Sequence, residues 1–290
     1  MRYRCYNYVN NIENNKEKER FAPHEQTENI SMEMPFKPNE GKNLTIDTDW
    51  GTYARFPIKT HVVMKEDVMN DLLDQYVMDY LEEGDMIFIS EKIVAITQGR
   101  ALKVSDIKIS RLAKFLVKFV YKSDAGIGIG APSTMELCLR ECGRVKVLFA
   151  AVIAGVCKLF GKRGVFYNIL GMKARAIDGP SEYNVPPYNE YAKMAPENPD
   201  GAAADMKAHA KVEVVIVDAN DLGCNVLGKS SKDISDKFCE QLYRDNPQDQ
   251  GFCQTPLAIV RKAENLEGKD KDLADMERAR FDADKEAANG

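Results

Sequence analysis

Two aspartates stand where apolar stretches of the sequence end, and both could take part in chemistry. Asp218 follows the apolar run VVIV and precedes Asn220 and Asp221, while Asp178 follows ARAI. A carboxylate in such a place is partly desolvated, which is costly unless it meets a cation, an array of donors or a metal. Mg²⁺ and Mn²⁺ take oxygen ligands and usually keep phosphate oxygens as well. The alternative is that Asp218 only caps a turn, alone or with Asn220.

Two further stretches could contact a ligand. The segment DNPQDQGFCQT, residues 245–255, is rich in amides. It could supply neutral oxygen ligands and nucleotide contacts, or be plain surface. The glycine-rich GIGIGAP, residues 126–132, resembles a phosphate-binding loop. A helix is expected before it, however, and Pro132 suits the start of the next helix, so we interpret it as a link between two helices.

Composition narrows the class of protein. The three histidines have no spacing typical of a catalytic triad or zinc site, and the seven cysteines are scattered, which favours reduced thiols in a cytoplasmic protein. A net charge of −5 does not indicate nucleic-acid binding. The apolar run 147–157 is far shorter than the roughly 20 residues of a membrane span, and we interpret it as a buried helix or strand. We therefore expect no nucleic-acid or membrane partner.

The elements that must position these residues alternate along the chain without a clean βαβ series, which indicates an α+β or mixed α/β fold. The polar stretch 1–48 is interpreted as an N-terminal extension, 49–262 as the functional domain and 263–290 as a charged C-terminal tail. Apolar periodicity predicts helices over 65–81, 111–121, 134–143, 202–211 and 233–247, and strands within 51–63 and over 86–90, 91–100, 212–218 and 255–261.

Five segments, in order, resemble one known family. FPIKTH, GDMIFISEKIVAITQGR, ARAIDGP, VVIVDANDLGCNVLG and QTPLAIVR are similar to motifs of the coenzyme F(420)-0:gamma-glutamyl ligase family, in a bacterial branch, over residues 52–261. The resemblance implies an α+β fold with a mixed sheet and two intertwined subdomains, in a homodimer. It also implies a ligase that uses GTP, or ATP, with Mg²⁺ or Mn²⁺ to join L-glutamate to a small carboxylate acceptor through an amide bond.

The resemblance also assigns metal ligands. Asp178, Asp218 and Gln250 match metal-binding positions of the family. Ala219 stands where the family has a threonine that binds a second metal, and Asp221 is the residue that could replace it. The metal site is therefore expected to comprise Asp178, Asp218, Gln250 and Asp221.

Nucleotide contacts follow from the same resemblance. Lys59 and Lys92 are the candidates to neutralise phosphate charge, and Ile96 aligns with a family lysine whose role Lys92 could take from another position. Cys253 stands where a polar loop residue is expected. The residues expected to contact the nucleotide are Pro57, Ile58, Lys59, Ser90, Glu91, Lys92, Asn220, Gly251, Gln254 and Thr255.

The implied reaction passes through an acyl phosphate, which the amine of glutamate then attacks. Its catalysis depends on positioning and charge stabilisation, so no catalytic histidine or cysteine is needed. Two alternatives remain open. One is a ligase for an unrelated pair of amine and carboxylate, and the other is a non-catalytic protein that binds a nucleotide or has a role in assembly on the same fold.

Overall fold

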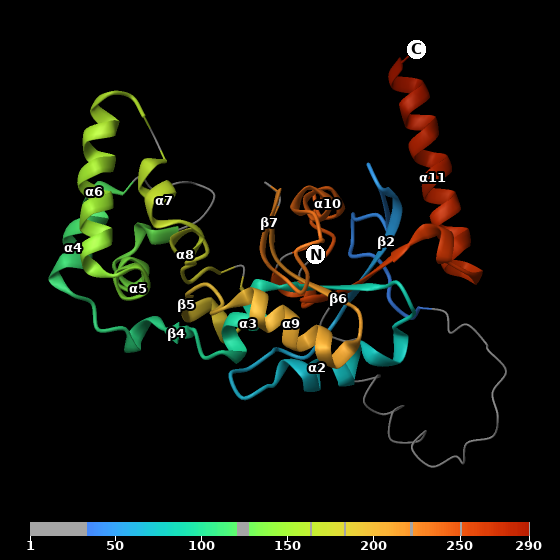
Figure 1. The fold of residues 1–290 in the computed structure, drawn as a ribbon, viewed down its shortest axis with the longest axis horizontal. Helices are drawn as coiled ribbons and strands as arrows, with labels where there is room; N and C mark the ends of the chain where they lie inside the picture. The colour runs from blue at the N-terminus through green and yellow to red at the C-terminus, as the bar shows by residue number, and fades with distance from the viewer. Residues whose placement is uncertain are drawn as a thin grey trace.

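A six-stranded mixed sheet forms the centre of the molecule (Figure 1). The computed structural model describes residues 34–120, 128–162, 164–182, 184–220, 223–249 and 251–289. The strand order is β1-β2-β8-β3-β6-β7, and a second sheet pairs β4 with β5. The strands are β1 (Thr45–Thr48), β2 (Gly51–Ile58), β3 (Met86–Ser90), β4 (Ala101–Lys103), β5 (Tyr191–Lys193), β6 (Glu213–Asn220), β7 (Gly223–Lys229) and β8 (Leu257–Lys262). The expected α+β class and mixed sheet are confirmed.

Strand direction decides what meets at each edge of the central sheet. β3 and β6 are parallel, while β8 runs antiparallel to both of its neighbours, β2 and β3. A single row of paired residues crosses four strands, from Ile58 through Leu257 and Ile89 to Ile216. The carboxyl ends of β2, β3 and β6 therefore lie at the same edge, together with the start of β8.

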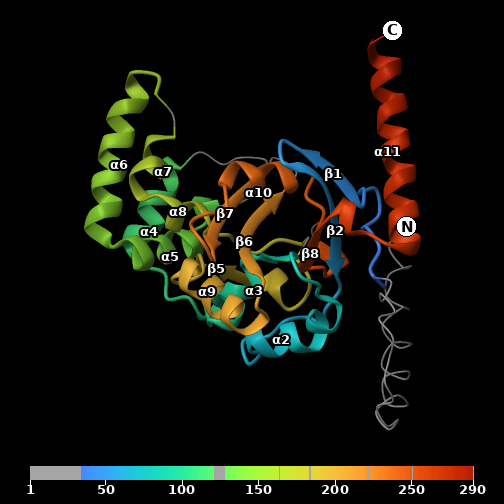
Figure 2. The same cartoon turned by 45° about the vertical axis from the view of Figure 1, so that its right-hand side comes forward.

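Alternating side chains give the sheet two apolar faces. Ile87 and Ile89 pack into the larger core, which α2 (Met69–Tyr76), α3 (Glu91–Thr97) and α9 (Pro199–Ala210) cover. Phe88 points the other way and stacks on Tyr243, at a centroid distance of 4.5 Å, beside α10 (Asp236–Leu242). Figure 2 shows the helices of the two cores on opposite sides of the sheet.

A group of helices beyond the small sheet has its own apolar core. It comprises α4 (Arg111–Leu116), α5 (Pro132–Cys142), α6 (Arg144–Leu159), α7 (Val165–Leu170) and α8 (Met172–Arg175). Leu137 and Cys138 of α5 are at the centre of this core. The group lies at one end of the molecule, away from the central sheet (Figures 1 and 2). Within the described residues, no helix combines the length and apolar content needed to cross a membrane.

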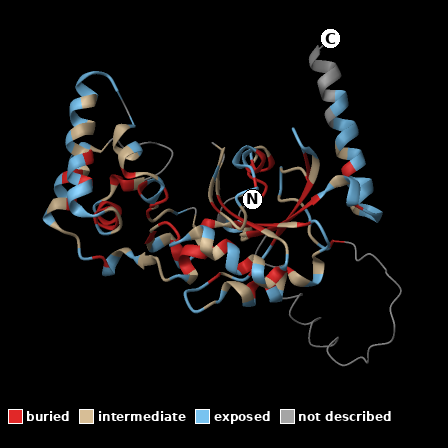
Figure 3. Ribbon diagram, in the orientation of Figure 1, coloured by how far each residue is buried: buried red, intermediate tan, exposed pale blue. Residues whose placement is uncertain are grey.

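Two predictions about apolar segments were wrong. Residues 91–100, expected as a strand, begin with α3, because burial of the run Ile93–Ile96 between neighbouring elements outweighs its β-branched composition. Residues 147–157 form part of α6, but only Val147 and Ala150 of that helix are buried (Figure 3). Apolar composition alone therefore did not predict burial.

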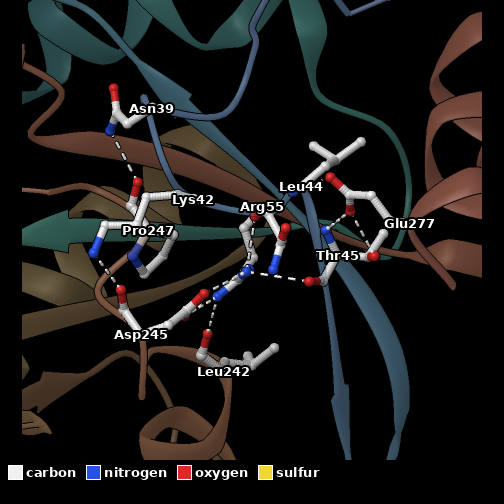
Figure 4. A network of polar contacts seen from close by, with 10 residues as sticks. Asn39, Lys42, Leu44, Thr45, Arg55, Leu242, Asp245, Pro247 and Glu277 are labelled. Atoms are coloured by element: carbon white, nitrogen blue, oxygen red, sulfur yellow. Dashed lines mark hydrogen bonds and ion pairs between the residues drawn. The ribbon is translucent and has the colours of Figure 1, made fainter. Parts of the chain in front are cut away.

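A buried arginine of β2 ties the central sheet to the end of α10 and the segment that follows it (Figure 4). Arg55 is fully buried and donates to the carbonyls of Leu242 (3.0 Å) and Asn43 (2.9 Å) and to Asp245 Oδ2 (3.0 Å). Each of these bonds fixes a chain segment against β2.

The C-terminal helix α11 (Gly268–Asn289) extends from the body of the molecule (Figure 2). Its Glu277 accepts hydrogen bonds from the backbone N–H groups of Leu44 and Thr45, both at 2.8 Å, and from the Thr45 hydroxyl at 2.9 Å. The tail expected over 263–290 is therefore helical and is anchored to β1. Of the N-terminal extension expected over 1–48, residues 1–33 lie outside the described residues, and β1 is an edge strand of the sheet.

Candidate active site

The shared edge of β2, β3 and β6 gathers most of the predicted site residues. Ser90 pairs with Val217 at the end of the parallel β3–β6 ladder. Glu91 and Asp218 directly follow these two paired residues, so they lie at the same edge. Lys59 follows β2 at the same edge, two strand spacings from β3, which is about 10 Å. Topology therefore brings together charged residues that are more than 150 positions apart in the sequence.

The loop before β8 closes this edge through its backbone. The N–H of Ser90 donates to the carbonyl of Pro256 at 2.8 Å, and the N–H of Thr60 donates to the carbonyl of Gln254 at 3.0 Å. Gln254 has a φ of 55°, a left-handed conformation that is uncommon for a residue other than glycine. The predicted loop residues thus lie next to the ends of β2 and β3.

Asp178 joins the site through β5. Its backbone forms an isolated antiparallel bridge with Lys193, with N···O distances of 3.1 and 2.9 Å. Its carboxylate accepts a hydrogen bond from the N–H of Gly179 at 2.8 Å. The bridge fixes Asp178 beside a lysine that the sequence did not mark as functional.

Lys193 is the central cation of the site. Its side chain is buried and donates hydrogen bonds to the carboxylate of Glu91 and, at 3.0 Å, to the carbonyl of Ala176. Burial by itself lowers the pKa of this ammonium, but the negative charges of Glu91, Asp178 and Asp218 outweigh burial and raise the pKa. Lys193 therefore stays protonated, within electrostatic reach of three carboxyl groups.

A signal for Lys193 was present in the sequence. The residue stands between Ala192 and Met194, so it is a charged side chain in an apolar setting, as are Asp178 and Asp218. The argument that predicted a cation near each aspartate applies equally to a lysine that needs an anion.

Glu91 carries an unused acceptor. Its carboxylate is buried, and the atom Oε2 has no hydrogen-bond partner. Burial raises the pKa of Glu91. The ion pair with Lys193 acts to lower this pKa, whereas the negative charge of Asp218 acts to raise it further. A buried carboxylate oxygen without a partner is costly, and a cation or a hydrogen-bond donor of a ligand would satisfy it.

Lys92 lines a small pocket next to this cluster. Its ammonium donates to Asn184 Oδ1 at 2.7 Å. Burial and then the positive charge of Lys193 lower the pKa of Lys92, against the opposing effect of Asp178, Glu91 and Asp218. The pocket has a volume of about 20 Å³, room for a water molecule, so a triphosphate must bind outside it. Its lining also includes Ile96, Ala101, Asp178, Gly179, Tyr188, Tyr191 and Lys193.

The residues present are compatible with a metal held jointly with a nucleotide. Within the described part of the chain, no three His, Cys, Asp or Glu side chains are close enough together to hold a metal by themselves. Mg²⁺, however, usually binds through one or two carboxylates together with substrate phosphates and water. One or two of the acids at this edge, such as Asp178 and Asp218, could supply carboxylate ligands of that type, and Glu91 Oε2 is an acceptor without a partner. The other two expected ligands, Gln250 and Asp221, lie outside the described residues.

Other expected contacts have roles within the fold. Pro57 and Ile58 are buried in the β2–β8 ladder, whereas Lys59 is exposed. The hydroxyl of Thr255 is buried and donates to the carbonyl of Gln248 at 2.5 Å. Asn220 is the last residue of β6, and Gly251 begins a 3₁₀ turn before β8.

The three departures from the family pattern are also engaged locally. Ala219 packs against the core beside α10, and Ile96 is buried beneath the sheet. The thiol of Cys253 donates to Asp249 Oδ2 at 3.3 Å. Each of these residues makes a packing or loop contact at a position where the family pattern has a charged or polar residue.

Comparison with known proteins identifies the family of this chain. The sequence model described as F420-0:Gamma-glutamyl ligase matches residues 57–226, which is more than half of the chain and includes Lys59, Lys92, Asp178 and Asp218. No curated protein matches the chain. The family implies a ligase enzyme. The chain belongs to the F420-0:gamma-glutamyl ligase family.

Proposed function

We propose that this protein is a nucleotide- and divalent-metal-dependent ligase that forms an amide bond between L-glutamate and a small carboxylate acceptor. The observation that carries the proposal is the cluster at the edge of the sheet, where Glu91 and Asp218 follow two parallel strands and meet Lys193. Membership of the ligase family supports the same reaction.

In this proposal Asp178 and Asp218 hold Mg²⁺ or Mn²⁺ beside the phosphates of GTP or ATP. The bound metal supplies charge neutralisation at the phosphate oxygens. Lys92, which interacts electrostatically with both aspartates, adds positive charge where the γ-phosphoryl group is transferred. Lys59, which follows β2 at two strand spacings (about 10 Å) from β3, contacts a more distant part of the nucleotide.

The chemistry proceeds in two displacements. An oxygen of the acceptor carboxylate attacks the γ-phosphorus, which forms an acyl phosphate and releases the nucleoside diphosphate. The amine of glutamate then attacks the acyl carbon, so that inorganic phosphate leaves and the amide bond forms. The side chains contribute position and charge rather than covalent bonds.

Lys193 acts as a positioning residue in this scheme. It holds Glu91 through a buried ion pair and holds Asp178 through the backbone bridge. Its charge also lowers the pKa of Lys92. We infer that Lys193 keeps the acids at a fixed spacing while the nucleotide binds and leaves.

A second candidate is a non-catalytic nucleotide-binding protein. It is favoured by Ile96, a buried apolar residue at the place of a family lysine, and by Thr255, whose hydroxyl is already engaged inside the loop. Such a protein would bind nucleotide without releasing phosphate. Both candidates are compatible with the homodimer and the cytoplasmic location that we expect, and light scattering would measure the mass in solution.

Phosphate release tests the proposal. The purified protein is incubated with GTP or ATP, with Mg²⁺ or Mn²⁺ and with L-glutamate, in the presence or absence of fractionated small carboxylate metabolites. Release that requires both glutamate and one metabolite fraction is the expected result. Nucleotide binding in a thermal-shift assay, without release in any fraction, would contradict a ligase and favour the binding protein.

A further inference from the structure

Helix α6 presents an apolar surface that nothing in the described structure covers. Of its 16 residues, only Val147 and Ala150 are buried. The helix lies at the outer end of the molecule, and its outward side is coloured as exposed in Figure 3. Soluble proteins rarely leave a continuous apolar surface open unless it binds something.

The exposed apolar residues form one stripe. They are Val145, Leu148, Phe149, Val152, Val156, Leu159 and Phe160, and their exposure ranges from 40% for Leu148 to 85% for Leu159. Steps of three and four residues place side chains on one side of a helix. The buried Val147 is two residues from Val145, or about 200° around the helix axis. The apolar stripe therefore faces away from the core of its own helical group.

The charged residues along α6 and just after it are all basic. Residues 144–162 contain Arg144, Lys146, Lys158 and Lys162 and no acidic residue, although the whole chain has a net charge of −5. Lys146 and Lys158 each adjoin a stripe residue, about 100° away around the axis, on opposite flanks. All four basic residues are exposed.

This charge pattern argues against direct pairing of α6 helices from two copies of the chain. An antiparallel pair of α6 helices would place Arg144 and Lys146 of one copy beside Lys158 and Lys162 of the other. A parallel pair would place each basic residue beside its own equivalent. Both arrangements bring like charges together, and residues 144–162 contain no acid to offset them.

We propose that α6 docks on a membrane surface that contains anionic lipids. An interfacial helix inserts Phe and Leu side chains at the boundary of the acyl chains while Lys and Arg contact anionic headgroups. The apolar stripe and its basic flanks match these two requirements. The helix would lie on the membrane, not cross it, and this proposal revises the expectation of no membrane partner.

Sedimentation with vesicles tests the proposal on the full chain, without substrates, so that the result does not depend on ligase activity. Vesicles of phosphatidylcholine alone are compared with an equal mixture of phosphatidylcholine and phosphatidylglycerol. We expect binding only to the anionic vesicles. Replacing Lys158 and Lys162 by Gln should weaken binding about thirtyfold, because each basic residue contributes about fivefold.

A second variant tests the apolar stripe. Phe149→Ser combined with Leu159→Ser should weaken binding about a hundredfold, since two large apolar side chains no longer leave water. Met276→Ser is the matched control, because Met276 is an exposed apolar residue on α11, and it should bind like the wild type. All the side chains to be replaced are exposed, and unchanged thermal unfolding would verify the fold.

Equal binding to neutral and anionic vesicles would overturn the proposal, and so would no binding to either. In the absence of binding, light scattering could show a wild-type dimer that becomes a monomer in the Phe149→Ser, Leu159→Ser variant. That result would assign the apolar stripe to an interface between copies.

Discussion

The ammonium of Lys193 donates a hydrogen bond to the carboxylate of Glu91, and both side chains are almost completely buried. Lys193 ends β5 of the small sheet, while Glu91 begins α3 directly after β3 of the central sheet. One ion pair therefore joins the two sheets at the candidate active site. Removing one member of a buried pair leaves the other charge uncompensated.

Lys193→Met should therefore lower the free energy of unfolding by about 3–5 kcal/mol. The double variant Glu91→Gln, Lys193→Met should be less destabilised than Lys193→Met alone, because no isolated charge remains buried. Urea unfolding of the wild type, both single variants and the double variant gives the coupling energy. A coupling energy near zero would contradict the assigned contact.

The pH dependence of activity should report on Lys92. Its pKa is lowered by burial and by Lys193, so Lys92 loses its proton at a lower pH than an ordinary lysine does. Phosphate release should therefore decline on the alkaline side, as pH rises through this lowered pKa.

Two variants test this assignment. Lys92→Arg should remove the decline, because arginine stays charged. Lys193→Met should move the decline to higher pH, because the charge of Lys193 no longer lowers the pKa of Lys92. An alkaline decline that is identical in Lys92→Arg would assign it to another group.

Arg55 should be critical for stability. Because it is fully buried and bonds to Asp245 and to carbonyls of three other residues, Arg55→Met should destabilise the fold by about 3–5 kcal/mol. Lys237→Met is the control, since Lys237 forms an exposed ion pair with Asp49 and should change stability far less. Similar losses in both variants, measured by urea unfolding, would contradict the importance of the buried network.

The C-terminal helix should contribute to stability through one residue. Glu277 accepts three hydrogen bonds from Leu44 and Thr45, and bonds to a charged group contribute about 1.5–3 kcal/mol. Glu277→Gln should therefore cost about 2 kcal/mol, whereas Asp275→Asn, an exposed neighbour on the same helix, should be neutral. Chemical unfolding would distinguish the two, and equal stability of both variants would mean that α11 is not anchored to β1.

The acids of the candidate site are easier to recognise in the sequence than the elements around them. Asp178 and Asp218 could be recognised because a carboxylate after an apolar run needs a compensating group. The parallel pairing of β3 with β6, which brings Glu91 to Asp218, depends on contacts 127 residues apart and is not encoded in any local pattern. Lys193 was missed because its partner Glu91 is distant in the chain.

The apolar composition of a segment did not by itself predict whether the segment forms a helix or a strand, or whether it is buried. The run Ile93–Ile96 is rich in β-branched residues, yet it forms a helix because it packs on the sheet that β3 has just left. The run 147–157 was expected to be buried because it is apolar. In its helix only Val147 and Ala150 are buried, because burial depends on neighbours that the sequence pattern does not specify.

The measurement that tests the central claim most directly is glutamate-dependent phosphate release by the Asp218→Asn variant. The assay uses the nucleotide, metal and acceptor fraction that support release by the wild type, and Asp233→Asn, an exposed aspartate outside the site, is the control. We predict that Asp218→Asn loses release by about a hundredfold or more while its unfolding midpoint stays close to that of the wild type. Release by Asp218→Asn at the rate of Asp233→Asn would contradict the assignment of the shared strand edge as the active site.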